Sequence, residues 1–95
     1  MPSGIIDVSS DKPSIKSGGS VRLTVSYFSK ATHELTITAS GKFSASYKQP
    51  QILAPDETGM VFVDVTITRG DPNDPHECIL TCTFYNSLPV SIGVT

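Results

Sequence analysis

Apolar and polar residues alternate along most of the chain, and this period of two constrains its fold more than any other feature of the sequence. The alternation is regular over residues 21–27, where Val21, Leu23 and Val25 are separated by polar residues. A strand with one buried face needs this spacing, because successive side chains point to opposite faces of a sheet. Further segments are predicted to be strands of the same kind: residues 5–8, 33–39, 43–47, 61–67, 78–84 and 90–94.

No stretch shows apolar residues at the three- and four-residue spacing of an amphipathic helix. About seven short strands within 95 residues predict an all-β chain. The expected fold is an immunoglobulin-like Greek-key β-sandwich, with a small barrel as the alternative, and residues 1–95 are expected to form a single domain. Residues rich in Gly, Pro, Asp, Asn and Ser predict turns at 11–13, 17–20, 40–42, 55–59, 70–75 and 86–89.

One local pattern occurs twice, in residues 13–21 and 50–61. Each copy has a proline, a branched apolar residue, a tight polar turn and then a long alternating strand. Because a sandwich needs corners where the chain passes between its sheets, we interpret both segments as such corners.

The composition excludes several classes of protein. Apolar residues make up 38% of the chain and the formal net charge is −2, values atypical of a disordered tail. A nucleic-acid binder needs a basic surface, which this charge does not supply. No apolar run approaches the roughly 20 residues that span a bilayer, so no membrane insertion is expected.

The two cysteines are Cys78 and Cys82. On a strand, residues four apart lie on one face but are separated by about 13 Å. This distance is too long for a disulfide and prevents both thiols from ligating one zinc ion. We therefore predict two buried, free thiols.

Residues 8–25, with Pro13, Ile15 and a Gly-Gly turn before the alternating strand, resemble the opening of bacterial and bacteriophage Ig-like domains. Residues 35–37, 41–44 and 52–58 are similar to the abnormal-spindle/hydin and major-sperm-protein-like sandwiches. An antibody-type domain is not indicated, because the chain has no Trp and both cysteines are on one predicted strand. The bacterial and phage resemblance implies a non-enzymatic module of surface adhesins or of phage capsids, tails and decoration proteins.

The loop at residues 69–77 carries the candidate site. Its opening tripeptide, Arg69, Gly70 and Asp71, resembles the integrin-binding sequence and is predicted to be an exposed binding element. The oxygen-bearing side chains that follow predict a calcium site, since carboxylate and amide oxygens are the ligands of Ca²⁺. Its ligands would be Asp71, Asn73, Asp74 and Glu77.

Two alternatives remain for this loop. His76 with Asp74 and Glu77 would instead suit a transition metal. The other alternative is a plain acidic turn made rigid by proline, which binds nothing.

Nothing in the sequence predicts catalysis. The two histidines, His33 and His76, belong to no nucleophile motif, and the adjacent carboxylates of Asp56 and Glu57 are expected to point apart. Phe62 and Tyr85 lie opposite buried stripes. They are either partly covered or part of an aromatic patch that binds a partner or a glycan.

The predicted function is a non-enzymatic structural or interaction module within a larger multidomain protein or assembly. We expect it on a virion, as a decoration or tail domain, or on a bacterial cell surface, with weak adhesion to a protein partner or cell-surface glycan. No cofactor other than calcium is expected. The alternatives are a cytoplasmic scaffold or targeting domain of the abnormal-spindle or sperm-protein type and a carbohydrate-binding module.

Overall fold

The computed structural model describes residues 2–49, 51–71, 73 and 75–95. This part of the chain contains nine β-strands and no helix, which confirms the all-β prediction. It accordingly holds no helix that is long and apolar enough to cross a membrane. The strands are β1 (Gly4–Ser10), β2 (Ser14–Ile15), β3 (Ser20–Ser29), β4 (His33–Ala39), β5 (Ser44–Tyr47), β6 (Gln51–Leu53), β7 (Asp56–Thr68), β8 (Glu77–Phe84) and β9 (Asn86–Val94).

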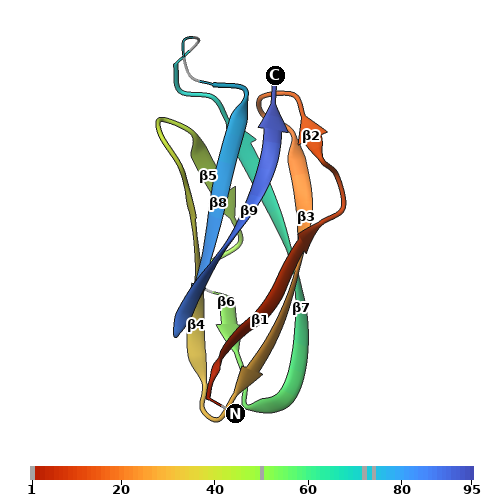
Figure 1. Ribbon diagram of the computed structural model, residues 1–95, viewed down its shortest axis with the longest axis vertical. Coiled ribbons are helices and arrows are strands. Elements are labelled where there is room, and N and C mark those ends of the chain that lie inside the picture. Colours follow the sequence, from red (N-terminus) through yellow and green to blue (C-terminus); the bar gives the residue numbers. More distant parts are fainter. Residues whose placement is uncertain (1, 50, 72, 74) are drawn as a thin grey trace.

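The strands form two sheets that pack face to face as a sandwich (Figure 1). Sheet A has the order β1-β3-β7-β5, and sheet B has the order β2-β9-β8-β4-β6. Neighbouring strands are antiparallel except β2 and β9, which are parallel. The molecule is elongated, with extents of 42 × 20 × 20 Å.

The core lies between the sheets and is built by the predicted stripes. Each stripe alternates with side chains that point outward and are mostly polar, so one face of its strand is buried and the other faces the solvent. Sheet A contributes Val21, Leu23, Val25, Val63, Val65 and Ile67, and sheet B contributes Leu35, Ile37, Leu80, Phe84, Ile92 and Val94.

Cys78 and Cys82 are free and fully buried on the inner face of β8, as predicted. Burial raises the pKa of the Cys82 thiol to about 11. Burial also raises the pKa of Cys78. Both thiols therefore behave as small apolar side chains of the core.

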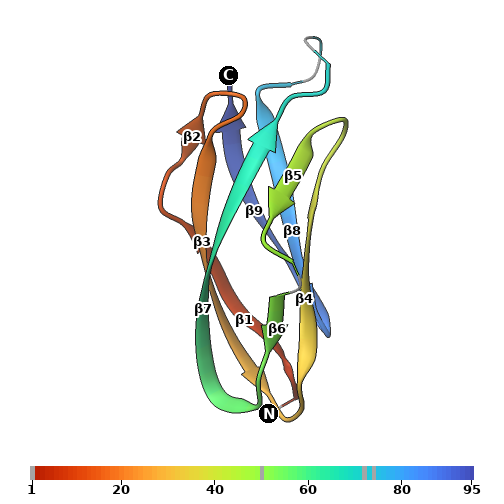
Figure 2. The same ribbon diagram turned by 180° about the vertical axis from the view of Figure 1, so that it is seen from behind.

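The alternation did not identify β2 and β6, which are two and three residues long. Both lie in the recurrent segments at residues 13–21 and 50–61. After each of them the chain passes from sheet B into sheet A, where it forms β3 or β7 (Figure 2). The prediction of two corners is confirmed.

The predicted turn at residues 55–59 is wrong, because β7 already begins at Asp56. The sequence suggested a turn because Pro55, Asp56 and Gly59 are turn formers. Gly59 has another role: a Cβ atom there would lie 2.3 Å from the Tyr27 ring. The glycine keeps β7 in register with β3 while that ring packs over it.

The predicted turn at residues 86–89 is also wrong, since β9 begins at Asn86. The reversal of the chain is confined to Tyr85, whose φ of 65° is left-handed. The Asn86 side chain then joins the sheets: Ile5 N donates to its Oδ1 (2.6 Å), and its Nδ2 donates to Ile5 O (3.0 Å). Asn86 thus acts as a clasp between β9 and β1.

The two ends of the chain lie at opposite ends of the long axis (Figures 1 and 2). Near the N-terminal end, Lys30 N donates to Ser3 Oγ (3.0 Å). At the C-terminal end, Thr95 N donates to Ile15 O, and Ser17 N donates to Thr95 O. Both ends are therefore tied to the body of the sandwich.

Candidate functional site

The predicted loop at residues 69–77 joins β7 to β8 at the C-terminal end of the molecule (Figure 1). Its Asp71 accepts hydrogen bonds from Asn73 N (2.9 Å) and Lys42 Nζ (3.2 Å). These two donors lower the pKa of Asp71, with the Asn73 bond as the larger cause. The carboxylate thus has partners inside the protein.

The two residues before Asp71 contact two other turns of the chain. Gly70 lies on the Lys42 backbone, since a Cβ atom there would be 2.1 Å from Lys42 O. Arg69 is half-buried, and its N–H donates to Ser17 Oγ (3.0 Å). The tripeptide Arg69, Gly70 and Asp71 is thus held by contacts with Ser17 and Lys42. Its binding role stays a prediction.

The predicted calcium ligands are only partly placed. Glu77 Oε1 accepts a hydrogen bond from Ser91 Oγ (2.7 Å), and Asp74 lies outside the described residues. Among the residues the structure does describe, no three His, Cys, Asp or Glu side chains are grouped so that they would hold a metal ion. His76 Nδ1 lies 3.3 Å from the backbone oxygen of Val94, the last residue of β9. The metal predictions for this loop remain untested.

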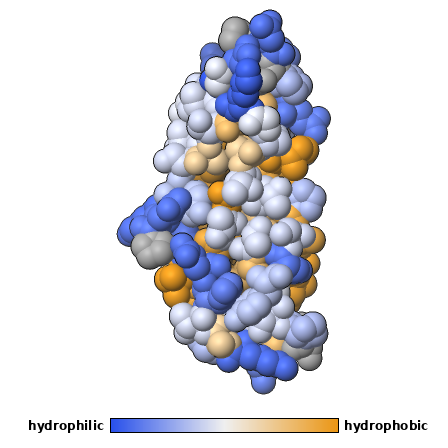
Figure 3. Space-filling model, turned by 90° about the vertical axis from the view of Figure 1, so that its left-hand side faces the viewer, coloured by the Kyte–Doolittle hydropathy of each residue, from blue (hydrophilic) through white to orange (hydrophobic). Residues whose placement is uncertain are grey.

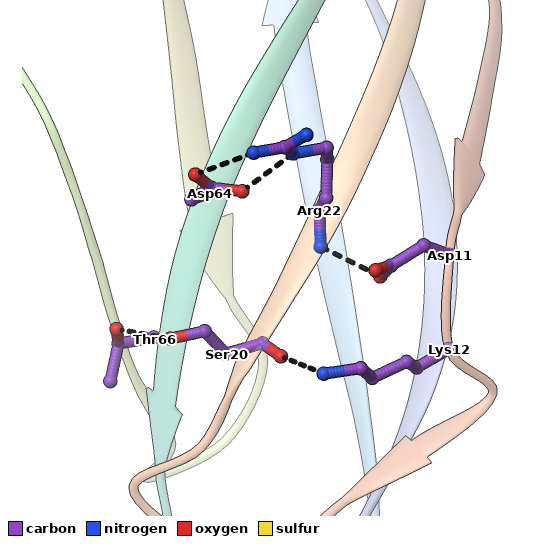
Figure 4. A network of polar contacts seen from close by, with 6 residues as sticks. All are labelled: Asp11, Lys12, Ser20, Arg22, Asp64 and Thr66. Carbon is purple, nitrogen blue, oxygen red and sulfur yellow. Dashed lines mark hydrogen bonds and ion pairs between the residues drawn. The ribbon is translucent and has the colours of Figure 1, made fainter.

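A second candidate surface is the outer face of sheet A, and its half near the C-terminal end is polar. Arg22 Nε and Nη2 donate to the two carboxylate oxygens of Asp64 at 2.9 and 3.3 Å (Figure 4). This ion pair lowers the pKa of Asp64 and raises that of Arg22. Further contacts extend the row, and we call the whole set the polar ladder: Asp11, Lys12, Ser20, Arg22, Asp64 and Thr66.

The other half of the same face is apolar. Met60 and Phe62 of β7 are each 61% exposed and point outward beside Ser26 and Thr24 of β3. Phe28 is half-buried on this outer face, since its neighbours along β3 point into the core. We call Phe28, Met60 and Phe62 the apolar patch.

The edge of sheet A beside this patch has no partner strand. β5 pairs with β7 only from Val65 to Thr68, although β7 begins nine residues earlier, at Asp56. Within the described ranges, no strand pairs with residues 56–64 on the side away from β3. We call this stretch of β7 the open edge.

Figure 3 looks onto the side of the sandwich on which β4 and β5 lie. Hydrophobic residues reach the surface there between hydrophilic ones. No pocket forms in the described part of the chain, so the candidate surfaces are open faces and edges.

Aromatic rings gather at the end opposite the loop. The Tyr85 and His33 rings stack at 4.4 Å, and Phe84 meets Tyr85 edge-on at 4.9 Å. Tyr85 is 52% exposed, and the rings of His33 and Phe84 cover part of its surface. Phe62 is the other aromatic residue singled out in the sequence, and within the described part of the chain its ring takes part in no ring–ring contact.

Sequence reasoning identified Phe62 but missed Met60, the polar ladder and the open edge. The polar face of β7 was visible in the alternation. What the sequence lacked was the register, which places Arg22 opposite Asp64 and leaves β5 too short to cover Met60. The uncharged run from Thr58 to Val63 was the available signal for an edge that pairs readily.

No protein-family model and no curated protein matches the chain. Among solved structures, it is similar to a Bacteroides ovatus GH5 xyloglucanase in complex with a heptasaccharide, at 9% sequence identity and a TM-score of 0.46. The similarity covers 94% of this chain and 19% of the xyloglucanase chain. At this level the similarity says nothing about activity or substrate.

Proposed function

We propose that this chain is a non-enzymatic, immunoglobulin-like Greek-key module that separates its neighbours and presents interaction surfaces. The assembly would be a virion, with the module in a decoration or tail protein, or a bacterial cell surface. The strand order supports the fold assignment: β1-β3-β7-β5 corresponds to the A-B-E-D sheet of an immunoglobulin constant-type domain, and β9-β8-β4 to its G-F-C sheet.

The observation that carries this proposal is the position of the two ends. They lie at opposite ends of a body 42 Å long, so the module would extend a chain of domains instead of folding it back. β2 and β9 run parallel, with Ser14 beside Gly93 and Ile15 beside Val94. A force that separates the ends therefore loads the bonds between these strands in shear, all at the same time.

Single-molecule pulling on tandem copies tests this role. We expect a clearly higher unfolding force when the copies are pulled through their ends than when one copy is pulled through handles at Glu77 and Thr95. The second geometry opens the β8–β9 hairpin from its open end, so its hydrogen bonds break one after another. Equal forces in the two geometries would contradict a load-bearing spacer.

A further inference from the structure

The open edge of β7 presents backbone groups in a regular row. Ile67 exchanges backbone hydrogen bonds with Gly18 and Gly19, so its N–H and C=O point toward the β3 side. These groups alternate in direction along a strand, and the register with β3 is unbroken down to Gly59. The N–H and C=O groups of Met60, Phe62 and Asp64 therefore point away from β3, toward the open edge.

The side chains of this edge suit a second strand. Residues 59–63 contain no charge and no proline, and their pairing with β3 is regular. The irregularity in that pairing is confined to residues 56–59, at the start of the edge. Unpaired edges are usually protected by lysine, proline or a bulge, and residues 59–63 have none of these. Met60 and Phe62 lie on the outer face, where an added strand would cover part of their exposed surface. The edge thus combines unused hydrogen-bonding groups with apolar side chains that are already exposed.

Charge distinguishes the two ends of the open edge. Asp56 and Glu57 are exposed at its start, and no salt bridge involves them in the described part of the chain. Asp64, at the other end, is already paired with Arg22. The start is therefore the acidic end, and it favours a basic partner.

A second copy of this chain fits the edge less well. An antiparallel pair that uses residues 56–64 of both copies is centred on Met60. It brings the acidic start of each copy, Asp56 and Glu57, close to Asp64 of the other copy, and like charges close together across two strands destabilise a sheet.

We propose that the open edge binds an extended segment of a partner protein by strand addition. This inference rests on the proposed interaction role and gives the partner its chemistry. Every pair in sheet A is antiparallel, so the segment runs antiparallel to β7. It has apolar or β-branched side chains beside Met60 and Phe62 and ends in Lys or Arg, which lie next to Asp56 and Glu57.

The test uses the intact chain and a synthetic peptide that alternates threonine and valine over eight residues and ends in two lysines. Titration followed in a two-dimensional amide spectrum should shift the amide signals of residues 57–64. A peptide of the same length that ends in two glutamates should bind more weakly. Shifts that are absent, or that lie only outside sheet A, would overturn the proposal.

A matched pair of variants separates backbone pairing from side-chain contact. Met60→Pro and Met60→Thr both remove the Met side chain, but only proline also removes the N–H that points to the open edge. We expect the peptide Kd to rise about tenfold more for Met60→Pro than for Met60→Thr. Equal Kd values for two folded variants would contradict strand addition.

Charge reversal gives a second readout if Met60→Pro does not fold. Glu57→Lys should weaken binding of the lysine-ended peptide about threefold and strengthen binding of the glutamate-ended one. Unchanged preference would contradict the assigned orientation.

Self-association provides a further outcome. If the chain alone forms a dimer that Met60→Pro abolishes and that excludes the peptide, the occupant is a second copy and the partner proposed here is wrong. The peptide-binding experiments do not depend on the pulling experiment. If strand addition fails, the spacer role can still be tested by pulling.

Discussion

The two halves of the outer face of sheet A are formed by the same central strands, β3 and β7, yet their surfaces differ. Near the C-terminal end, β5 covers the edge of β7, and the adjoining face carries the Arg22–Asp64 pair of the polar ladder. Toward the other end the edge is open, and the face carries Met60 and Phe62. The half with a completed edge is thus hydrophilic, while the half with unused backbone groups is apolar.

This difference indicates a division of tasks within one sheet. Exposed cross-strand ion pairs add little to stability but keep a surface soluble and unreceptive to other strands. An exposed apolar row beside an open edge has the opposite property. If so, the apolar half is stabilised by its interior contacts, and its surface can be changed with little effect on stability.

The largest effect is expected from Gly59→Ala in the apolar half. The new methyl group would meet the Tyr27 ring at 2.3 Å, so β7 or the ring must move. We expect a loss of about 3 kcal/mol in the free energy of unfolding, measured by urea denaturation. Thr58→Ala, at an exposed neighbouring position, is the control and should change little; an equal loss in both variants would show that the Tyr27 contact is unimportant.

Asn86→Ala should have the next largest effect, because it removes the clasp between β9 and β1. The N–H and C=O of Ile5 would each lose their side-chain partner. We expect a loss of about 2 kcal/mol in the free energy of unfolding. Asn86→Asp keeps the acceptor for Ile5 N–H but places a carboxylate oxygen, in place of the Nδ2 donor, against Ile5 O, so at pH 7 it should be no more stable than Asn86→Ala. A clearly smaller loss in Asn86→Asp would show that the bond to Ile5 O does not stabilise the joint.

A smaller effect is expected in the polar half, from Asp64→Asn. The folded-state pKa of Asp64 lies below its ordinary value of 3.8, because Arg22 donates hydrogen bonds to the carboxylate. The pair therefore stabilises the fold above pH 4, and this contribution disappears as the pH falls through the folded-state pKa. Urea midpoints of both proteins should differ slightly at pH 7 and low salt, and the difference should shrink as the pH falls below 4 or in 1 M NaCl. A difference that does not shrink in acid would contradict this account.

The smallest effect on stability is expected from Phe62→Thr. The ring is mostly exposed, so its removal should change the free energy of unfolding by less than about 0.5 kcal/mol. It should nevertheless weaken binding of the lysine-ended peptide. A large loss of stability would show that the patch supports the fold. The two halves would then differ in how they are packed, and not in their availability for binding.

The alternation predicted the long strands because burial of one face is a local, sequence-wide requirement. The predictions of turns were wrong at Asp56 and Asn86, where turn-forming residues lie inside strands. In each case a distant residue supplies the reason: the Tyr27 ring above Gly59, and the Ile5 backbone held by Asn86. Residue preferences for turns are weak compared with such tertiary contacts.

The candidate loop shows the same limit. Its residues were chosen for their chemistry, but Asp71 is held by Lys42 from the β4–β5 turn, and Glu77 is bonded to Ser91 on β9. Neither partner is near in sequence, so residue type alone could not reveal them. The open edge and the apolar patch likewise depend on contacts distant in sequence, because they exist only where β5 ends before it covers the start of β7.

The sequence by itself determined that this chain is all-β, which faces of its long strands are buried, and that its two thiols lie apart in the core. These properties follow from the period of two and from the rise of a strand, both of which are local. The tertiary structure alone decided the pairing of strands, the length over which β5 covers β7, and the clasp at Asn86. These three features depend on register and on contacts between residues far apart in the chain. The register and the length of β5 distinguish the polar half of the outer face of sheet A from the apolar half, which we propose binds a partner.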